Sequence, residues 1–183
     1  MVRRKTTQEI LGESIHELAK VKSVDKITIK EIVDNCGLSS ATFYRHFQDK
    51  YELIAWIYNY QLEYIFTDLS EEMETWRQAI YDSVSILDND RSFYLNAFMH
   101  TDGPNSFFMA TYSKCEDLLI NLIERKCGDK LTEEILFDVD FYMRGSSYTI
   151  YEWFVYGKRN YSVEQLTDHL YRIMPDNLKP YLM

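Results

Sequence analysis

The residues best suited to contact a polyanion form a short cluster just before position 50. Small residues at the start of a helix let its backbone approach the edges of base pairs in a major groove, where hydroxyl and methyl groups can contact bases. Tyrosine, arginine and histidine side chains can reach phosphate oxygens, and an arginine can also bind guanine. The chemistry that this cluster predicts is the binding of duplex DNA, through Ser39, Ser40, Ala41, Thr42, Tyr44, Arg45 and His46.

Basic residues flank this cluster on both sides. Lys50 is expected in the first turn of the following helix, where a helix N-terminus and an ammonium group can hold one phosphate together. Lys30, one turn into the preceding helix, can contact the opposite backbone. The basic stretch at residues 3–5 can add a minor-groove or phosphate contact.

The elements that must position this cluster are two short helices joined by a tight turn. Thr28, with a glutamate three residues later, forms a capping box at the start of the first helix. Gly37 stands where a helix end needs a residue in the left-handed conformation. The second helix is capped by Ser39 and turns Phe43 and Phe47 inward. This is the geometry of a helix-turn-helix, although any tight helical hairpin with a glycine has similar spacing.

The rest of the chain also predicts helices. Only 3 prolines and 6 glycines interrupt 183 residues, of which 46% are hydrophobic and 27% charged, and no alternating strand pattern stands out. We expect an all-α fold of about nine helices. A helix-turn-helix domain is expected over residues 1–48 and a helical domain over 49–183, with the helix at 49–66 connecting them. The other expected helices begin near residue 7 and span about 70–88, 91–99, 106–126, 133–156 and 162–174.

Capping residues indicate the ends of several expected helices. Ser70 is expected to cap the fifth helix, with Glu71 and Glu72 in its first turn. Gly128 and Gly157 are expected to follow the ends of the two long helices near the C-terminus. The remaining expected caps are Thr6, Thr132 and Ser162, and the clearest loop is residues 101–105.

The net charge of −9 is unevenly divided along the chain. Residues 1–60 carry nine Lys or Arg against eight Asp or Glu, a net charge of +1, whereas residues 61–183 carry eleven against twenty-one, a net charge of −10. The acidic part is repelled by a phosphate backbone and should point away from DNA. The weak positive charge of residues 1–60 leaves an alternative open, a helical protein-protein interaction module with a degenerate helix-turn-helix.

Residues 27–54 resemble the signature of the tetracycline-repressor (TetR/AcrR) family of transcriptional regulators. The matching strings are Ile-Thr-Ile-Lys-Glu-Ile-Val, Cys-Gly-Leu-Ser, Ala-Thr-Phe-Tyr-Arg-His-Phe and Asp-Lys-Tyr-Glu-Leu-Ile. The resemblance implies a homodimer that binds a palindromic operator. It also implies control by a small-molecule or protein effector bound to the C-terminal domain, with repression the expected direction and activation the alternative.

The same resemblance assigns individual contacts. The phosphate-binding lysine of the family falls on Lys50, and a further contact falls on Lys30 with Thr28 at its cap. Ser40 and Ala41 depart from the larger polar residues of some members, so phosphate contacts and DNA shape are expected to carry part of the specificity. The recognition-helix contacts of the family fall on Ser40, Ala41, Thr42, Tyr44 and His46.

The resemblance further implies that the last two long helices form the dimer interface. The expected helix at 133–156 is apolar on more than one side, which suits a subunit interface together with a core, or a core alone. The expected dimer contacts are Val139, Met143, Ser146, Ile150, Leu166 and Leu170. Aromatic residues, 15% of the chain, can fill a core or line an effector pocket. The candidate pocket residues are His100, Tyr112, Tyr148 and Trp153, with Asp102 nearby.

The C-terminal part is also loosely similar to a subset of the family, the dihydroxyacetone-kinase regulators. The shared features are Phe141-Tyr142, Gly145, Trp153-Phe154, Gly157 and a final Leu-Tyr-Arg-Ile-Met-Pro string. This resemblance implies that the effector could be a partner protein instead of a free small molecule.

Other classes of function find no support in the residue pattern. The three cysteines form no CxxC pair and the four histidines lack metal-ligand spacing, so we expect no metal, no cofactor and no disulfide framework. No catalytic triad, glycine-rich phosphate loop or pair of catalytic carboxylates can be placed, so we expect no enzyme. No apolar h-region follows the basic start and no run of 18 apolar residues exists, so we expect a cytoplasmic protein without a membrane span.

Overall fold

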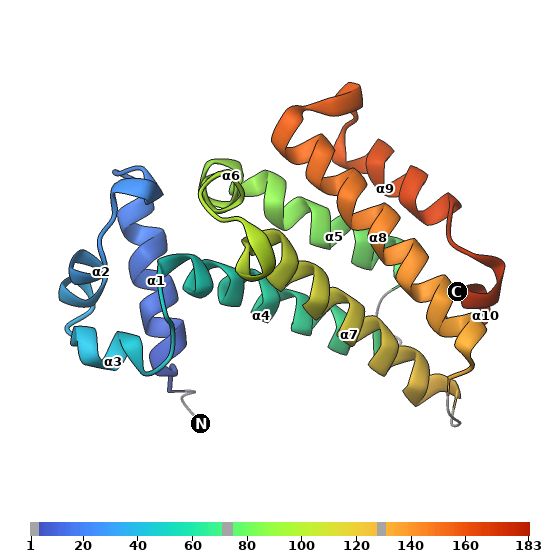
Figure 1. Cartoon of the computed structure of the whole chain (residues 1–183), viewed down its shortest axis with the longest axis horizontal. Coiled ribbons are helices and arrows are strands. Elements are labelled where there is room, and N and C mark those ends of the chain that lie inside the picture. The colour runs from blue at the N-terminus through green and yellow to red at the C-terminus, as the bar shows by residue number, and fades with distance from the viewer. Residues whose placement is uncertain (1–3, 71–74, 128–130) are drawn as a thin grey trace.

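The computed structural model describes residues 4–70, 75–127 and 131–183, and every regular element within these ranges is a helix (Figure 1). The all-α prediction is therefore confirmed. The α-helices are α1 (Thr7–Ala19), α2 (Ile29–Asn35), α3 (Ser40–Tyr44), α4 (Lys50–Ser70), α5 (Trp76–Asn89), α6 (Arg91–Met99), α7 (Phe107–Cys127), α8 (Glu133–Tyr156), α9 (Val163–Arg172) and α10 (Lys179–Leu182). Short 3-10 helices lie in the connections: η1 (Val24–Lys26), η2 (Gly103–Asn105), η3 (Lys158–Asn160) and η4 (Asp176–Leu178).

Local capping interactions begin and end several of these helices. The hydroxyls of Thr6, Thr28 and Ser162 each accept a hydrogen bond from the backbone N–H three residues later, and the side chain there bonds back. Gly37 and Gly157 follow α2 and α8 with φ values of 70° and 62°, a conformation that glycine reaches without strain. Local sequence therefore determines these helix ends.

The boundary between α4 and α5 differs from the prediction. α4 continues to Ser70 because its buried face extends through Leu69, which is 2% exposed. α5 begins only at Trp76, where the hydroxyl of Thr75 caps it. The prediction that Ser70 caps this helix is wrong, and the acidic first turn expected for it falls in residues 71–74, outside the described residues.

The end of the chain contains a helical segment that the sequence did not indicate. η4 and α10 follow Pro175, where helical structure was expected to have ended. They form because Leu178 and Leu182, 0% and 3% exposed, pack against the core. The glycine expected to stop α7, Gly128, lies outside the described residues.

α1, α2 and α3 pack into a small unit at one end of the molecule (Figure 1). Its interior is formed by side chains that are 0% exposed, among them Leu11 of α1, Ile32 of α2 and Phe43 of α3. The buried hydroxyl of Ser14 donates to the carbonyl of Ile32 at 2.7 Å, so the polar group inside this unit is satisfied. α1, α2 and α3 form the helix-turn-helix unit discussed below.

α4 links the helix-turn-helix unit to the rest of the chain. α1 packs closely on α4 at Gly12, where a Cβ atom would lie 3.2 Å from the Ile57 side chain. Further along, α4 packs against α7, α7 packs against α8, and α5 packs against α9. Figure 1 shows α8 and α9 on the side of this helical body that faces away from α2 and α3. No helix among the described residues is long and apolar enough to span a bilayer.

Candidate nucleic-acid interface and cavity

The exposed face of α3 is polar and is supported by aromatic packing beneath it. Phe43 and Phe47, 0% and 3% exposed, are buried beneath this face, with their ring centroids 5.8 Å apart, and Phe47 also contacts Trp56 of α4. Tyr44 is 59% exposed, and Arg45 and His46 beside it are exposed as well. The two phenylalanines therefore hold the predicted contact residues outward at the end of the molecule.

The start of α3 is organised by two hydroxyl groups. Ser39 is the N-cap, and its Oγ accepts from the backbone N–H of Thr42 at 3.1 Å. The Ser39 and Thr42 hydroxyls also lie 2.9 Å apart and share a hydrogen bond. Ser40 and Ala41 are exposed in the first turn between them. The side chains at the tip of α3 are thus small, so a base edge could come close to its backbone.

The start of α2 carries both a cation and an anion. Lys30 is exposed and forms an ion pair with Asp34 at 2.6 Å, a surface contact that contributes little to stability. Within the capping box, the Thr28 hydroxyl donates to the Glu31 carboxylate and accepts from the Glu31 backbone N–H. Hydrogen bonds from Lys22 and from Thr28 lower the pKa of Glu31 to about 2, so this carboxylate stays ionised at neutral pH. Lys30 is the basic group here that a phosphate could recruit.

Lys50 does not present a free ammonium group. Its Nζ donates to the carbonyl oxygens of Val24, Asp25 and Ile27 at 2.7, 2.8 and 2.8 Å, which uses all three of its N–H donors. Partial burial lowers the pKa of this ammonium group. A phosphate contact would require at least one of these bonds to break, and the contact expected for Lys50 stays a prediction. In this structure it ties the start of α4 to η1 and to the segment before α2.

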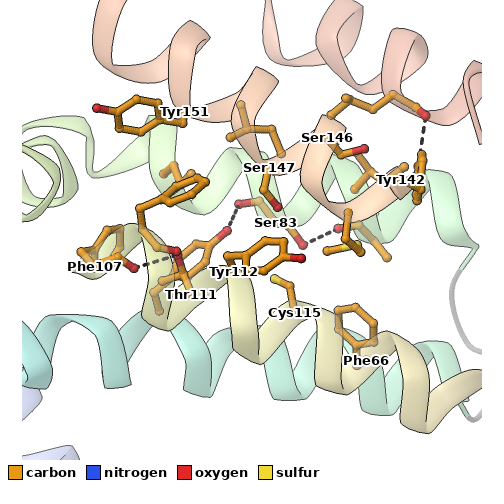
Figure 2. Close-up of a pocket in the computed structure, with 18 of the residues that line it drawn as sticks. Phe66, Ser83, Phe107, Thr111, Tyr112, Cys115, Tyr142, Ser146, Ser147 and Tyr151 are labelled. Atoms are coloured by element: carbon orange, nitrogen blue, oxygen red, sulfur yellow. Dashed lines mark hydrogen bonds between the residues drawn. The ribbon is translucent and has the colours of Figure 1, made fainter. Parts of the chain in front are cut away.

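A cavity of about 90 Å³ lies in the body among α4, α5, α7 and α8 (Figure 2). Its wall is apolar and rich in aromatic rings, and none of the described residues that line it carries a charge. Burial raises the pKa of the Cys115 thiol in this wall to about 12, so the thiol stays protonated at neutral pH. The cavity is therefore an apolar space with a protonated thiol in its wall.

The predicted pocket residues are only partly brought together. Tyr112 lines the cavity, with its hydroxyl directed to the Glu116 carboxylate at 2.7 Å. His100 is exposed and stacks on Tyr51 with a centroid distance of 6.3 Å. Asp102 is exposed in the loop that follows. Of the three predicted residues outside α8, Tyr112 alone faces the cavity.

The two pocket residues predicted on α8 also lie away from the cavity. Tyr148 is 55% exposed on the outer side of the helix. Trp153 is buried, but its indole N–H donates to the carbonyl of Tyr161 at 2.8 Å, beyond the cavity. Sequence reasoning instead missed the aromatic wall, for which the high aromatic content was the available signal. The missed wall residues include Tyr58, Phe66, Trp76, Phe98, Phe107 and Phe108.

Five of the six predicted dimer contacts are buried inside the protomer, and Ile150 is half-buried. Val139 and Leu166 are 0% exposed, and Met143 is 6% exposed. Met143, Ser146, Ile150 and Leu170 line the cavity instead. The five buried residues cannot contact a second chain without opening the body, so the prediction is wrong for them, and Ile150 stays a prediction. The α8 face that points outward consists of Phe137, Phe141, Gly145 and Tyr148, with Phe137 and Phe141 each 68% exposed. We call these four residues the outer α8 face.

Comparisons with known proteins match both parts of the chain. Residues 13–57 match the family model for bacterial regulatory proteins of the tetR family, and residues 74–176 match that for a transcriptional regulator C-terminal region. The HTH-type dhaKLM operon transcriptional activator DhaS of Lactococcus lactis subsp. lactis is 24% identical over 120 residues. That alignment covers 66% of this chain and 64% of the relative, which is less than two thirds of the relative's length.

Solved structures with low sequence identity share the fold. The dihydroxyacetone kinase operon activator DhaS has a TM-score of 0.62 at 20% identity, covering 97% of this chain and 98% of that one. FadR of Thermus thermophilus, a TetR-family repressor solved with lauroyl-CoA, has a TM-score of 0.64 at 13% identity, covering 91% of this chain and 92% of that one. A TetR regulator from Rhodococcus sp. has a TM-score of 0.63 at 18% identity, covering 90% and 91%.

The two family models together cover both the helix-turn-helix unit and most of the body. The C-terminal model by itself matches more than half of the chain. The chain therefore belongs to the tetR family of bacterial regulatory proteins.

Proposed function

We propose that the chain acts as a two-fold symmetric dimer that binds a palindromic operator through two copies of α3, under the control of an effector bound in the body. The observation that carries this proposal is the polar outer face of α3, backed by Phe43 and Phe47, in a matched helix-turn-helix. The match of residues 13–57 to the tetR family model supports this reading over the alternative of a degenerate interaction module.

The DNA contacts of the proposal follow from exposure. Ser40 and Ala41 at the tip of α3 approach base edges, and Tyr44, Arg45 and His46 reach phosphates or a guanine. Lys30 contacts the opposite DNA backbone from α2. Thr28 caps α2, and Ser39, hydrogen-bonded to Thr42, caps α3. The acidic body extends away from α3, as Figure 1 shows, so its charge does not oppose this contact.

The proposed dimer interface is the outer α8 face. Phe137 and Phe141 stack with their ring centroids 6.3 Å apart and form a solvent-exposed apolar patch, the kind of surface that marks association sites. At Gly145 a Cβ atom would meet nothing within 4 Å, so the helix surface is open there to close approach by a second helix. Tyr148 continues the face one turn further along.

The proposed route from effector to DNA runs through α6. Phe98 on α6 lines the cavity. On the side of the helix-turn-helix unit, Phe93 stacks on His16 at 4.2 Å, and the Asn96 amide donates to Asp25 of η1 at 3.5 Å. A ligand that displaces α6 would therefore move the helix-turn-helix unit and change the separation of the two α3 helices. The relative DhaS is named an activator and FadR a repressor, and this route is compatible with both directions of control.

A selection on random duplexes tests the DNA-binding part. We expect an enriched palindrome, measured with the full chain, whereas flat enrichment at low salt would support the interaction module. With the enriched duplex, fluorescence polarisation should show at least tenfold weaker binding for Tyr44→Ala and for Arg45→Ala, corresponding to about 1.4 kcal/mol or more per contact. Ser113→Ala, an exposed change on α7, is the matched control. Wild-type affinity in both α3 variants would refute the placement of the interface.

A further inference from the structure

Among the described residues of the cavity wall, Ser146 has a buried hydroxyl oxygen without a hydrogen-bond partner. Ser146 is 7% exposed, and its side chain lines the cavity from α8 (Figure 2). Burial raises the pKa of Tyr142, one turn earlier on α8, to about 12. The Trp76 indole and the neighbouring Ser146 hydroxyl lower this pKa, but by less than burial raises it. The Ser146 oxygen nevertheless does not meet the geometry of a hydrogen bond. It remains an unused polar group inside an apolar space.

Four other hydroxyls of the wall have hydrogen-bond partners. Ser83 and Thr111 donate to the carbonyls four residues earlier on their own helices, at 2.7 and 2.9 Å. Tyr58 donates to a carbonyl of α5 at 3.2 Å, and Tyr142 donates to a carbonyl of α9 at 3.0 Å. Leaving a buried hydroxyl unpaired costs free energy, so Ser146 marks the position where a partner from outside the chain would fit.

The size and charge of the cavity restrict what that partner can be. An apolar cavity of about 150 Å³ binds benzene, and the volume here is about 90 Å³, enough for one ring with a modest shift of flexible wall residues such as Met143. No lysine, arginine or histidine lines the cavity in the described part of the chain. An unpaired carboxylate or phosphate would therefore be buried at a prohibitive cost. A polyol would likewise leave most of its hydroxyls unpaired.

We propose that this cavity binds a neutral aromatic molecule of about one ring, whose single polar group hydrogen-bonds to Ser146 Oγ. The inference rests on the proposed function for its regulatory meaning, because it names the chemical class of the effector. The rings of Phe66, Trp76 and Phe107 pack around the ligand, and Phe98, which is part of α6, contacts it as well. This ligand class differs from the lauroyl-CoA bound by FadR, which carries phosphates and a long acyl chain.

Calorimetric titration of the full chain with four probes tests the ligand class. Phenol supplies one ring and one hydroxyl, toluene the ring without the hydroxyl, benzoate a ring with a charge, and glycerol three hydroxyls without a ring. We expect saturable binding of phenol at one site per chain, with toluene about fivefold to tenfold weaker, the effect of one hydrogen bond. We expect no binding of benzoate or glycerol. Benzoate or glycerol binding as tightly as phenol would overturn the inference, as would the absence of phenol and toluene binding.

Two variants on α8 test the assignment to Ser146. Ser146→Ala should lower phenol affinity about fivefold to tenfold, to the level of toluene, and leave toluene affinity unchanged. Thr149→Ala is the matched control, because its hydroxyl donates to the Gly145 carbonyl at 2.7 Å and does not line the cavity. Equal effects of the two variants on phenol binding would overturn the assignment. Retained toluene binding by Ser146→Ala shows that the variant is folded.

Binding to the selected duplex, measured separately without ligand, distinguishes the two proposals. Calorimetry does not depend on DNA, so phenol binding by a chain that binds no duplex would refute the proposed function and support this inference. A chain that binds a palindrome but none of the probes would support DNA binding and refute this inference. If phenol binds and leaves operator affinity unchanged, the ligand class is supported and its role as effector is refuted.

Discussion

The helix-turn-helix unit and the helical body have different interiors. In the unit, Phe43 and Ile32 are 0% exposed and the buried hydroxyl of Ser14 is hydrogen-bonded. In the body, a cavity remains among the aromatic side chains, and the hydroxyls of Ser146 and Thr167 are buried without partners. A close-packed interior resists deformation, whereas an interior with unfilled volume can adjust. The helix-turn-helix unit is therefore expected to hold α3 in one geometry, and the body is expected to be the part whose packing can adjust.

The same two regions also differ at the surface. The unit exposes polar side chains on α3 and just after it, with Arg45 and His46 among the latter. The body exposes phenylalanines on the outer α8 face, with Phe137 and Phe141 each 68% exposed. Polar and basic groups suit a phosphate-bearing partner, while exposed aromatic rings suit a second protein chain. Each exposed surface thus fits a different partner of the proposed regulator.

The largest expected effect compares packing in the two interiors. Phe43→Ala should destabilise the chain by about 3–5 kcal/mol, because a fully buried ring leaves a cavity in a close-packed unit. Phe66→Ala, at the wall of the existing cavity, should cost less because part of that ring already faces empty space. Urea unfolding of both variants measures the difference. Equal losses would contradict the contrast between the two interiors.

The next effect concerns the outer α8 face. Phe141→Glu should convert the dimer to monomer, because each subunit would then bury a carboxylate in the interface. Operator affinity should fall by about 100-fold or more, since the second α3 no longer binds as part of the same molecule. Sedimentation and fluorescence polarisation measure the two effects. Met109→Glu, at an exposed residue on α7, is the control, and a dimer that persists in Phe141→Glu would place the interface elsewhere.

A smaller effect separates positioning from phosphate binding. Lys50→Met should lower stability by about 1–3 kcal/mol, because three carbonyl oxygens lose their donor. Operator affinity should fall while the slope of its salt dependence stays unchanged. Lys30→Met should leave stability nearly unchanged and reduce the slope of the salt dependence of operator affinity by about 1. A reduced salt slope in Lys50→Met would show that Lys50 does contact a phosphate, as the sequence predicts.

The smallest effect is a pH dependence within the helix-turn-helix unit. The pKa of Glu31 is lowered from 4.5 to about 2 by hydrogen bonds from Lys22 and from Thr28. A lowered pKa means that this carboxylate stabilises the folded chain above pH 4.5 and loses that contribution as the pH falls toward 2. Thermal unfolding should therefore show Glu31→Gln less stable than wild type at pH 7, with the gap narrowing by pH 3. Glu124→Gln, at an exposed residue of α7, should show no such convergence.

The local features of the helix-turn-helix unit could be predicted from the sequence. Thr28 and Ser39 cap α2 and α3, and Gly37 adopts the left-handed conformation between them, because these preferences act over three or four residues. Phe43 and Phe47 are both buried, as their spacing of four predicted, although α3 ends at Tyr44 and Phe47 lies just beyond it. The family signature of the resemblance then indicated DNA binding.

Long-range contacts decided the rest. Lys50 was expected at a phosphate, but carbonyls more than twenty residues earlier in the chain hold its ammonium group. α8 is apolar on more than one side, so periodicity revealed two buried surfaces without showing which one meets the chain's own body. Packing against α5 and α7 turned Met143 and Ser146 toward the cavity and left Phe141 outside. The sequence by itself determined most of the helices, the N-terminal caps of α1, α2, α3, α8 and α9, and the helix-turn-helix unit. Only the tertiary structure decided which face of α8 is core, because that choice depends on neighbouring helices that are distant in the chain.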